Sequence, residues 1–154
     1  MPYFHGSPVR DSAPVFGSEG NTTPRITPGR PFFICEDMEF AEFFARGGLV
    51  SEVRPDLTRL ADLQDPDLLD RLLGVFNEDA AIVAGRGVWD EDLDVDIADS
   101  SYFLLESVDV CQALLAEGFT SARCIECVER KVYSIALLCP TAVLDVKLVN
   151  SPMR

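Results

Sequence analysis

The chain has 154 residues, of which 47% are hydrophobic and 25% charged, and its formal net charge is −13. This length and composition fit one globular domain over residues 1–154 that buries its core without disulfides or a metal ion. The 13 basic and 26 acidic residues disfavour direct binding to nucleic acid. No run of about eighteen apolar residues is present to span a membrane. An acidic surface suits a basic protein partner, such as one that itself binds nucleic acid.

Five cysteines, an odd number, accompany an N-terminus that lacks a basic region followed by an apolar run. This pattern favours a reducing cytoplasm and free, mostly buried thiols. Cys124 and Cys127 form a CxxC pair, for which redox and zinc interpretations exist. No second pair accompanies it and the sole histidine, His5, is far away in sequence, so the pair is interpreted as structural and no metal site is expected.

The N-terminal third is predicted to be mainly strand and loop. Residues 1–4 predict a short strand closed by a turn at His5-Gly6-Ser7-Pro8. Residues 9–29 are rich in glycine, proline, serine and threonine, which predicts a long loop and suggests a flap over a pocket. The apolar run at residues 31–35 predicts a strand in the centre of its sheet.

A helix is predicted over residues 38–46, capped by Glu36-Asp37 and ended by Gly47-Gly48. A third strand follows at residues 49–53, and after a turn a short edge segment carries Leu57, Leu60 and Leu63. The residues expected to face inward on the helix are Phe40, Ala41, Phe43, Phe44 and Ala45.

The middle of the chain is predicted to be helical. A helix begins at Asp65-Pro66-Asp67, keeps its apolar period to about residue 77, and is followed by a further helical segment at residues 80–84. The acidic residues 89–99 are interpreted as a solvated face and not as a calcium loop. Residues 102–117 predict the last long helix, which Gly118 would cap.

Strands are predicted again at the C-terminal end, over residues 121–127, 132–138 and 143–149, with a polar turn at Glu129-Arg130-Lys131 between the first two. Strands at both ends and helices in the middle predict an α+β fold.

Three distant segments supply what cleavage of the glycosidic bond of NAD requires. His5 would donate a hydrogen bond to a ribose hydroxyl, and the backbone of Gly6 would approach the nicotinamide amide closely. Phe33 would stack on the nicotinamide ring. On the strand at residues 121–127, side-chain alternation places Glu126 on one face with Ala122 and Cys124, where its carboxylate would stabilise an oxocarbenium-like state.

These segments carry a family resemblance. The chain resembles the ADP-ribosyltransferase superfamily, and especially its small bacterial and phage members, which include anti-CRISPR proteins that modify a Cas subunit. The resemblance runs nearly end to end, with residues 85–99 the least matched. The motifs that carry it are Phe4-His5-Gly6-Ser7, Phe32-Phe33-Ile34-Cys35-Glu36-Asp37, Gly118-Phe119-Thr120-Ser121 and Ser134-Ile135-Ala136-Leu137-Leu138-Cys139-Pro140.

The resemblance implies a split mixed β-sheet around an NAD cleft and transfer of ADP-ribose from NAD to a protein target, as in toxins and other effectors. It implies that Glu126 is catalytic, with Glu129 as the rival carboxylate. The position two before the glutamate is Cys124, which leaves the acceptor side chain open. It implies NAD-binding roles for His5, Gly6, Ser7, Phe33 and Cys35, of which Phe33 replaces the usual tyrosine and Cys35 the usual serine or threonine.

Two alternatives follow from the same residues. One is an ADP-ribosyltransferase-like protein that has lost catalysis and acts through its acidic surface as an inhibitor or nucleic-acid mimic, which the departures at Phe33 and Cys35 permit. The other is hydrolysis of NAD, with water in place of the protein acceptor.

Overall fold

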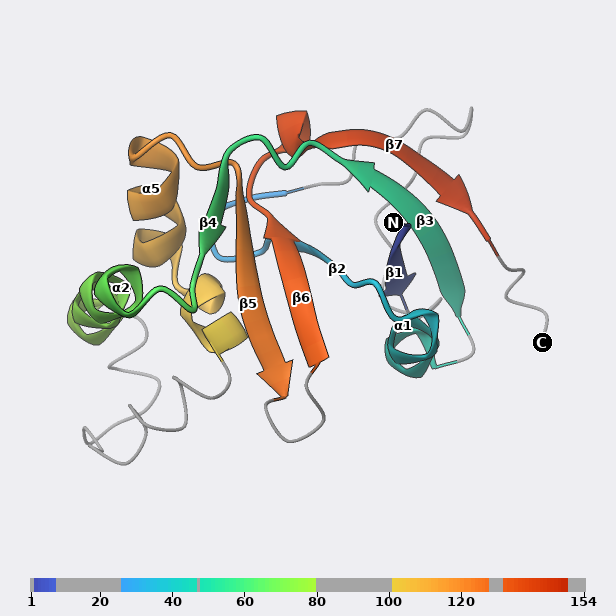
Figure 1. The fold of residues 1–154 in the computed structure, drawn as a ribbon, viewed down its shortest axis with the longest axis horizontal. Coiled ribbons are helices and arrows are strands. Elements are labelled where there is room, and N and C mark those ends of the chain that lie inside the picture. Colours follow the sequence, from blue (N-terminus) through green and yellow to red (C-terminus); the bar gives the residue numbers. More distant parts are fainter. Residues whose placement is uncertain (1, 8–25, 47, 80–100, 128–131, 150–154) are drawn as a thin grey trace.

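The computed structural model describes residues 2–7, 26–46, 48–79, 101–127 and 132–149, and for Cys127 the backbone alone. These residues form an α+β fold with two β-sheets (Figure 1). The elements in chain order are β1 (Tyr3–Ser7), β2 (Phe32–Ile34), α1 (Met38–Ala45), β3 (Leu49–Pro55), β4 (Leu60–Asp62), α2 (Pro66–Glu78), the 3₁₀ helix η1 (Ser101–Glu106), α5 (Val108–Ala116), β5 (Ser121–Cys127), β6 (Val132–Leu137), the 3₁₀ turn η2 (Pro140–Ala142) and β7 (Val143–Leu148).

The two sheets differ in topology. The first has the order β1-β3-β7 and is antiparallel throughout. The second has the order β2-β6-β5-β4, with β4 and β5 parallel and the other pairs antiparallel. An isolated bridge between Phe4 and Cys35 joins the start of the first sheet to the chain just after β2. The expectation of an α+β fold with mixed strand pairing is therefore correct.

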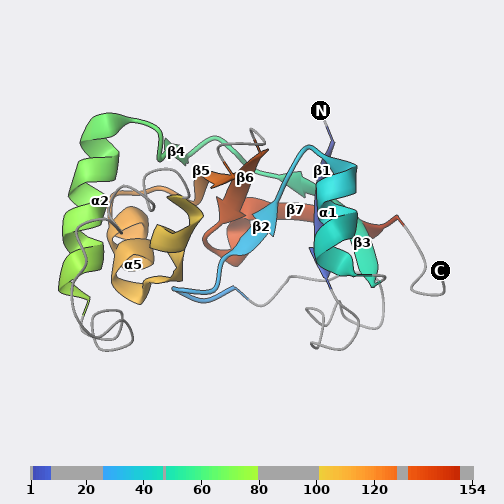
Figure 2. The same ribbon diagram turned by 90° about the horizontal axis from the view of Figure 1, so that it is seen from below.

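The helices lie at opposite ends of the molecule. Figure 2 shows α2 and α5 beside each other at one end, and α1 at the other end against β1 and β3. Asp37 caps α1, because its Oδ1 accepts hydrogen bonds from the amides of Glu39 and Phe40 at 2.9 and 3.3 Å. Asp65 caps α2 in the same way, with Pro66 in the first turn. Both caps agree with the sequence prediction.

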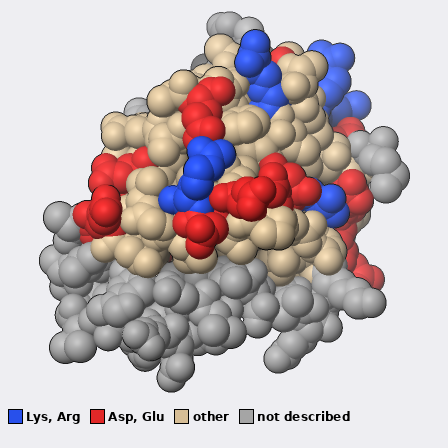
Figure 3. All heavy atoms as spheres, turned by 60° about the vertical axis from the view of Figure 1, so that its left-hand side comes forward, with Lys and Arg blue, Asp and Glu red and all other residues tan. Residues whose placement is uncertain are grey.

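The helix α2 is amphipathic and faces water on one side. Asp67, Asp70 and Glu78 are exposed on it, whereas Leu68 and Leu72 are buried. Figure 3 views this side of the molecule, where acidic side chains form several patches among fewer basic ones. Within the described residues, no helix has both the length and the apolar character needed to cross a bilayer.

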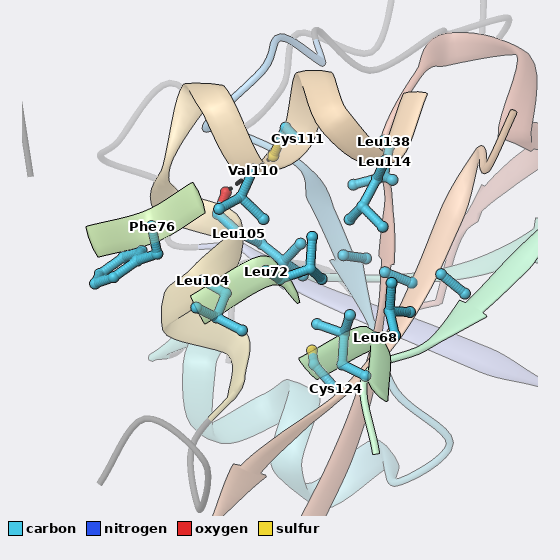
Figure 4. Close-up of a cluster of buried hydrophobic side chains, with 14 residues drawn as sticks. Leu68, Leu72, Phe76, Leu104, Leu105, Val110, Cys111, Leu114, Cys124 and Leu138 are labelled. Atoms are coloured by element: carbon cyan, nitrogen blue, oxygen red, sulfur yellow. Dashed lines mark hydrogen bonds between the residues drawn. The ribbon is translucent and has the colours of Figure 1, made fainter. Parts of the chain in front are cut away.

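The largest buried cluster lies between the second sheet and the helices α2, η1 and α5 (Figure 4). Leu104, Leu105 and Leu114 in this cluster have no exposed surface, and Cys124 of β5 is equally buried. A second cluster, containing Phe32, Ile34 and Leu137, fills the space on the other side of the second sheet. A small third cluster of Cys35, Ala41, Ala45 and Val50 lies under α1. The sheets are therefore held by separate apolar contacts on each side.

The segment His5-Gly6-Ser7 does not form the predicted turn. It belongs to β1, where His5 pairs with Ser51 and Gly6 pairs with Val50. Glycine is required here for a different reason: the carbonyl of Ala41 in α1 occupies the position that a β-carbon on residue 6 would take. The helix can approach β1 this closely only because residue 6 has no side chain.

The strand at residues 31–35 was predicted to be central, and this is wrong. The observed β2 is an edge strand, paired only with β6 among the described elements. Its residues are apolar on both faces because Phe32 and Ile34 pack into the second cluster while Phe33 contacts the first. Inward packing was also wrong for Phe43 and Phe44, which are 68% and 46% exposed on α1.

The predicted helix over residues 102–117 is divided in two at Ser107. This residue is fully buried, and its Oγ accepts a hydrogen bond from the amide of Val110 and donates one to Asp79 Oδ2 at 2.6 Å. It therefore caps α5, while η1 precedes it with a tighter winding. Gly118 follows α5 with a φ of 92°, as expected for a helix C-terminus.

The other predicted strands and helices are present with small shifts. The strand predicted at residues 49–53 extends to Pro55, and β4, β5, β6 and β7 lie where strands were predicted. Most of the loop at residues 9–29, the helical segment 80–84, the acidic residues 89–99 and the turn containing Glu129 lie outside the described residues.

We expect Gly6→Ala to lower the free energy of unfolding by about 1–3 kcal/mol, because its β-carbon would overlap the Ala41 carbonyl and force α1 away from β1. Chemical denaturation measures the change. Gly74→Ala is the matched control: no atom lies within 4 Å of the added carbon, and Gly74 is exposed within α2. This control should stabilise the protein by about 0.5–1 kcal/mol. Equal effects of the two substitutions would contradict this account of the α1 contact.

Candidate active site

A cavity of about 320 Å³ lies where β1, β2, α1, η1 and the ends of β5 and β6 meet. Its walls are mainly aromatic and aliphatic, with a few polar groups. We call it the aromatic cavity. The residues that line it are Phe4, His5, Gly6, Phe33, Ile34, Cys35, Phe40, Ala41, Phe44, Tyr102, Glu106, Glu126 and Ser134. The structure thus brings His5, Phe33 and Glu126, from three distant segments, to one cavity.

Glu126 reaches the aromatic cavity at an irregularity in β5. Ile125 pairs with Tyr133 but Cys127 pairs with Val132, so the register shifts at Glu126. Bulges of this kind redirect a side chain and occur often beside active sites. Ala122 and Cys124, predicted to share a face with Glu126, are buried in the main core, and Cys124 pairs with Ser134, which bonds the Glu126 carboxylate, so this carboxylate stands at the rim of that core.

The Glu126 carboxylate is held by a buried hydrogen-bond donor. Ser134 Oγ on the neighbouring strand donates to Glu126 Oε1 at 2.9 Å, and Ser134 is only 2% exposed. Burial raises the pKa of Glu126, the hydrogen bond from Ser134 lowers it, and the nearby charge of Glu106 raises it further. The net direction is upward, which is the behaviour of a carboxylate placed in a partly dry site.

Two residues of η1, Tyr102 and Glu106, also line the aromatic cavity, and sequence reasoning missed both. Burial raises the pKa of Tyr102, and the charges of Glu126 and Glu106 raise it further. Burial likewise raises the pKa of Glu106. These charge effects require the groups to lie within electrostatic range of one another, so the cavity contains two neighbouring carboxyl groups beside a phenol.

His5 is fixed by contacts on two sides. Its Nδ1 lies 2.7 Å from the carbonyl oxygen of Phe33, and its ring stacks on Phe32 with centroids 3.9 Å apart. Burial lowers the pKa of His5, against a smaller upward effect of the Phe33 hydrogen bond. A neutral imidazole that donates from Nδ1 leaves Nε2 as an acceptor. His5 can therefore accept a hydrogen bond from a ligand hydroxyl, which replaces the predicted donation.

The remaining predicted residues differ in their placement. Phe33, Gly6 and Cys35 line the aromatic cavity. Burial raises the pKa of the Cys35 thiol to about 11, so this side chain is a neutral wall and not a thiolate. Ser7 is buried at the end of β1, where it pairs with Leu49, and does not line the cavity. Glu129, the rival carboxylate, lies outside the described residues.

Ser134 is a third residue of the site that was not predicted, and for this one the sequence held a signal. Ser134 is a polar residue inside an otherwise largely apolar predicted strand, and a buried hydroxyl requires a hydrogen-bond partner. Pairing β5 with β6 in register would have directed attention to the Glu126 side chain. Tyr102 and Glu106 gave no such signal, because an unbroken helix over residues 102–117 does not predict where η1 turns.

The charge of the cavity walls limits the chemistry. Among the described lining residues, Glu106 and Glu126 are the charged groups, and neither lysine nor arginine is present. Aromatic rings and carboxylates together favour a flat, cationic or electron-poor ligand. Within the described residues, no group of three or more histidine, cysteine, aspartate and glutamate side chains is arranged to hold a metal ion.

Comparison with known proteins gives one structural neighbour. No protein-family model matches the sequence, and a comparison with curated proteins finds no match. A crystal structure of an anti-CRISPR protein is similar to this chain, with a TM-score of 0.44 and 18% sequence identity over 97% of this chain and 95% of the other.

Proposed function

We propose that this protein is a mono-ADP-ribosyltransferase, which transfers ADP-ribose from NAD to a protein target and releases nicotinamide. One observation carries the proposal: His5, Phe33 and Glu126 line the same cavity although they are far apart in sequence. His5 and Phe33 are 28 positions apart, and Glu126 lies on β5, near the other end of the chain. An effector role, such as that of an anti-CRISPR protein, belongs to the same proposal and rests on the resemblance of the motifs alone.

The nicotinamide end of NAD has the flatness and the charge that the lining of the aromatic cavity would favour. Its pyridinium ring is flat and positively charged, so it would be attracted both to the face of Phe33 and to the two carboxyl groups. Gly6 also lines the cavity, where its backbone would meet the carboxamide, while α1 fills the space on its β-carbon side. Nε2 of His5 would accept a hydrogen bond from a ribose hydroxyl.

In the reaction, the bond between the ribose C1′ and the nicotinamide nitrogen breaks, and its electron pair leaves with the neutral nicotinamide. The sugar passes through an oxocarbenium-like state whose positive charge the Glu126 carboxylate would stabilise. Ser134 keeps that carboxylate in one orientation before the charge develops. A nucleophilic side chain of the target then forms a bond to C1′ and loses a proton. Water as the nucleophile would give hydrolysis by the same residues, and product analysis distinguishes the two outcomes.

A second candidate is an acidic binding protein without catalysis. The net charge of −13 and the acidic patches on the side that bears α2 favour it (Figure 3). This candidate requires no affinity for NAD and a salt-sensitive affinity for a basic partner. Calorimetric titration with NAD distinguishes it from the transferase, which must bind the dinucleotide.

Glu126→Gln should reduce nicotinamide release from NAD by about 100-fold or more, because the lost carboxylate acts mainly on the transition state. NAD affinity should change little, since the amide has the same shape and still accepts a hydrogen bond from Ser134. Chromatographic measurement of nicotinamide and calorimetry of NAD binding test the two parts. Glu78→Gln, at the exposed end of α2, is the control and should retain full activity. Equal turnover in both variants would refute the role of Glu126.

The rate of nicotinamide release should fall as the pH drops through the raised pKa of Glu126, because only the ionised form stabilises the oxocarbenium. This acid limb should lie at higher pH than for an ordinary glutamate. Ser134→Ala should move the limb to still higher pH, since it removes a hydrogen bond that lowers this pKa. Glu106→Gln should move it to lower pH, since it removes a charge that raises the pKa. A pH profile of kcat/KM measures each limb, and shifts in the same direction would rule out this arrangement.

A further inference from the structure

The strand β7 is the outer edge of the first sheet, beyond β3 and away from β1 (Figure 1). Within the described ranges, no strand pairs with its second edge. The amide of Val149 donates to the Val50 carbonyl at 2.8 Å, so this residue directs its backbone toward β3. Backbone direction alternates along an antiparallel strand, and the pairing with β3 is regular from Asp145 to Leu148, so the amides and carbonyls of Val146 and Leu148 are directed outward.

The side chains of this edge are unusually apolar for an outer strand. Leu144 is 53% exposed and Leu148 is 56% exposed; Leu148 lies on the same face of the strand as Val146, and Leu144 lies at the register shift between Val143 and Asp145. Natural edge strands are commonly protected by charge, and exposed leucines provide little such protection. The exposed apolar surface and the outward backbone groups together describe a surface for strand addition.

The opposite face of β7 carries a charge pattern with a specific order. Lys147 pairs with Glu52 on β3, and Asp145 pairs with Arg54. Opposite charges therefore face each other twice across the β3–β7 pair. On β7 itself the sequence Leu144-Asp145-Val146-Lys147-Leu148 is symmetric about Val146 in residue class, with the two charges of opposite sign at mirror positions.

We propose that β7 pairs with β7 of a second copy of this chain, antiparallel and centred on Val146. In this register Leu144 faces Leu148 of the second copy, and Asp145 faces Lys147 of the second copy, each twice by the two-fold symmetry. Charges then alternate in sign across the four strands. Glu52 and Lys147 of one copy are followed by Asp145 and Arg54 of the second copy, so no like charges are adjacent. The outward backbone groups of Val146 and Leu148 supply the hydrogen bonds.

This pairing is selective for one register, because a shift by one residue removes both the leucine pairs and the opposite-charge pairs. Such a slip would bring a leucine opposite a charged residue and would direct the exposed leucines to opposite faces. A lysine on an edge strand usually prevents pairing with other strands. Lys147 therefore permits the one register in which Asp145 of the second copy lies opposite it. The dimer would be a continuous six-stranded sheet in the order β1-β3-β7-β7-β3-β1. The aromatic cavity adjoins β1, so both copies of it stay open.

Sedimentation equilibrium between about 1 µM and 1 mM should give a species of twice the 17.0 kDa chain mass. Lys147→Asp and Asp145→Lys should each raise the dimer dissociation constant by about tenfold or more, since each places like charges opposite each other. Asp145→Lys reduces the net negative charge of the chain, so dissociation of the dimer of this variant cannot be due to repulsion between the net charges of the two copies. Mixing the two variants should restore a heterodimer, because both charged pairs across the interface between the copies are again opposite in sign.

Arg71→Asp is the control for net charge, because it changes the charge by the same amount as Lys147→Asp on the exposed surface of α2 and should leave the dimer unchanged. Val146→Pro should also give a monomer, since the lost amide is directed away from β3 and the β3–β7 hydrogen bonds remain. Circular dichroism verifies that each variant is folded. A monomeric wild-type protein over the whole concentration range, a dimer that survives both charge variants, or a mixture that stays monomeric would each overturn the proposal.

Discussion

The joint between the two sheets determines the rest of the structure. Phe4 and Cys35 exchange backbone hydrogen bonds of 2.7 and 2.9 Å, and beside them His5 Nδ1 donates to the Phe33 carbonyl at 2.7 Å. These three bonds hold β1 of the first sheet against the edge strand β2 of the second. The sheets diverge from this joint, and the aromatic cavity lies where they do so, with α1 on one side and η1 on the other. Gly6 completes the arrangement by allowing α1 to approach β1.

The polar groups of the cavity depend on the same joint. A register shift in β5 places Glu126 at the cavity, and the buried Ser134 of β6 orients its carboxylate. The C-terminal part of β6 pairs with β2. A second carboxyl group, Glu106, comes from η1, which exists because the buried Ser107 ends one helical segment and caps the next. Most of the remaining wall is apolar. Burial in such a site disfavours the charged form of a carboxyl group, so the pKa of each one is displaced upward.

Much of the fold could be predicted from the sequence because local signals were strong. Asp37 and Asp65 precede apolar helical periods, and Gly118 follows one, so helix ends were well marked. The position of β2 at an edge could not be predicted, because an apolar run on both faces indicates burial and does not distinguish a central strand from an edge strand covered by other elements. The reason for Gly6 was likewise tertiary, since the contact with Ala41 joins residues far apart in sequence.

In the site too, local motifs could be predicted from the sequence, whereas features that depend on tertiary contacts could not. His5, Phe33 and Glu126 were predicted from the motifs and the resemblance, and the structure places them in one cavity. The hydrogen-bonding role of His5 could not be predicted, because it depends on the Phe33 carbonyl that fixes the tautomer. Glu106 and Tyr102 depend on a break in a helix that has no glycine or proline to mark it, and the burial of Ser107 at that break is known only from the structure.

The central claim is that the aromatic cavity binds NAD through its nicotinamide end. A crystal structure of the Glu126→Gln variant with NAD tests this claim most directly, since slow turnover would preserve the dinucleotide. We expect the nicotinamide ring against Phe33, a ribose hydroxyl at Nε2 of His5, and the ribose C1′ beside residue 126. NAD bound elsewhere, or in this cavity with its adenine inward and the nicotinamide in solvent, would contradict the account.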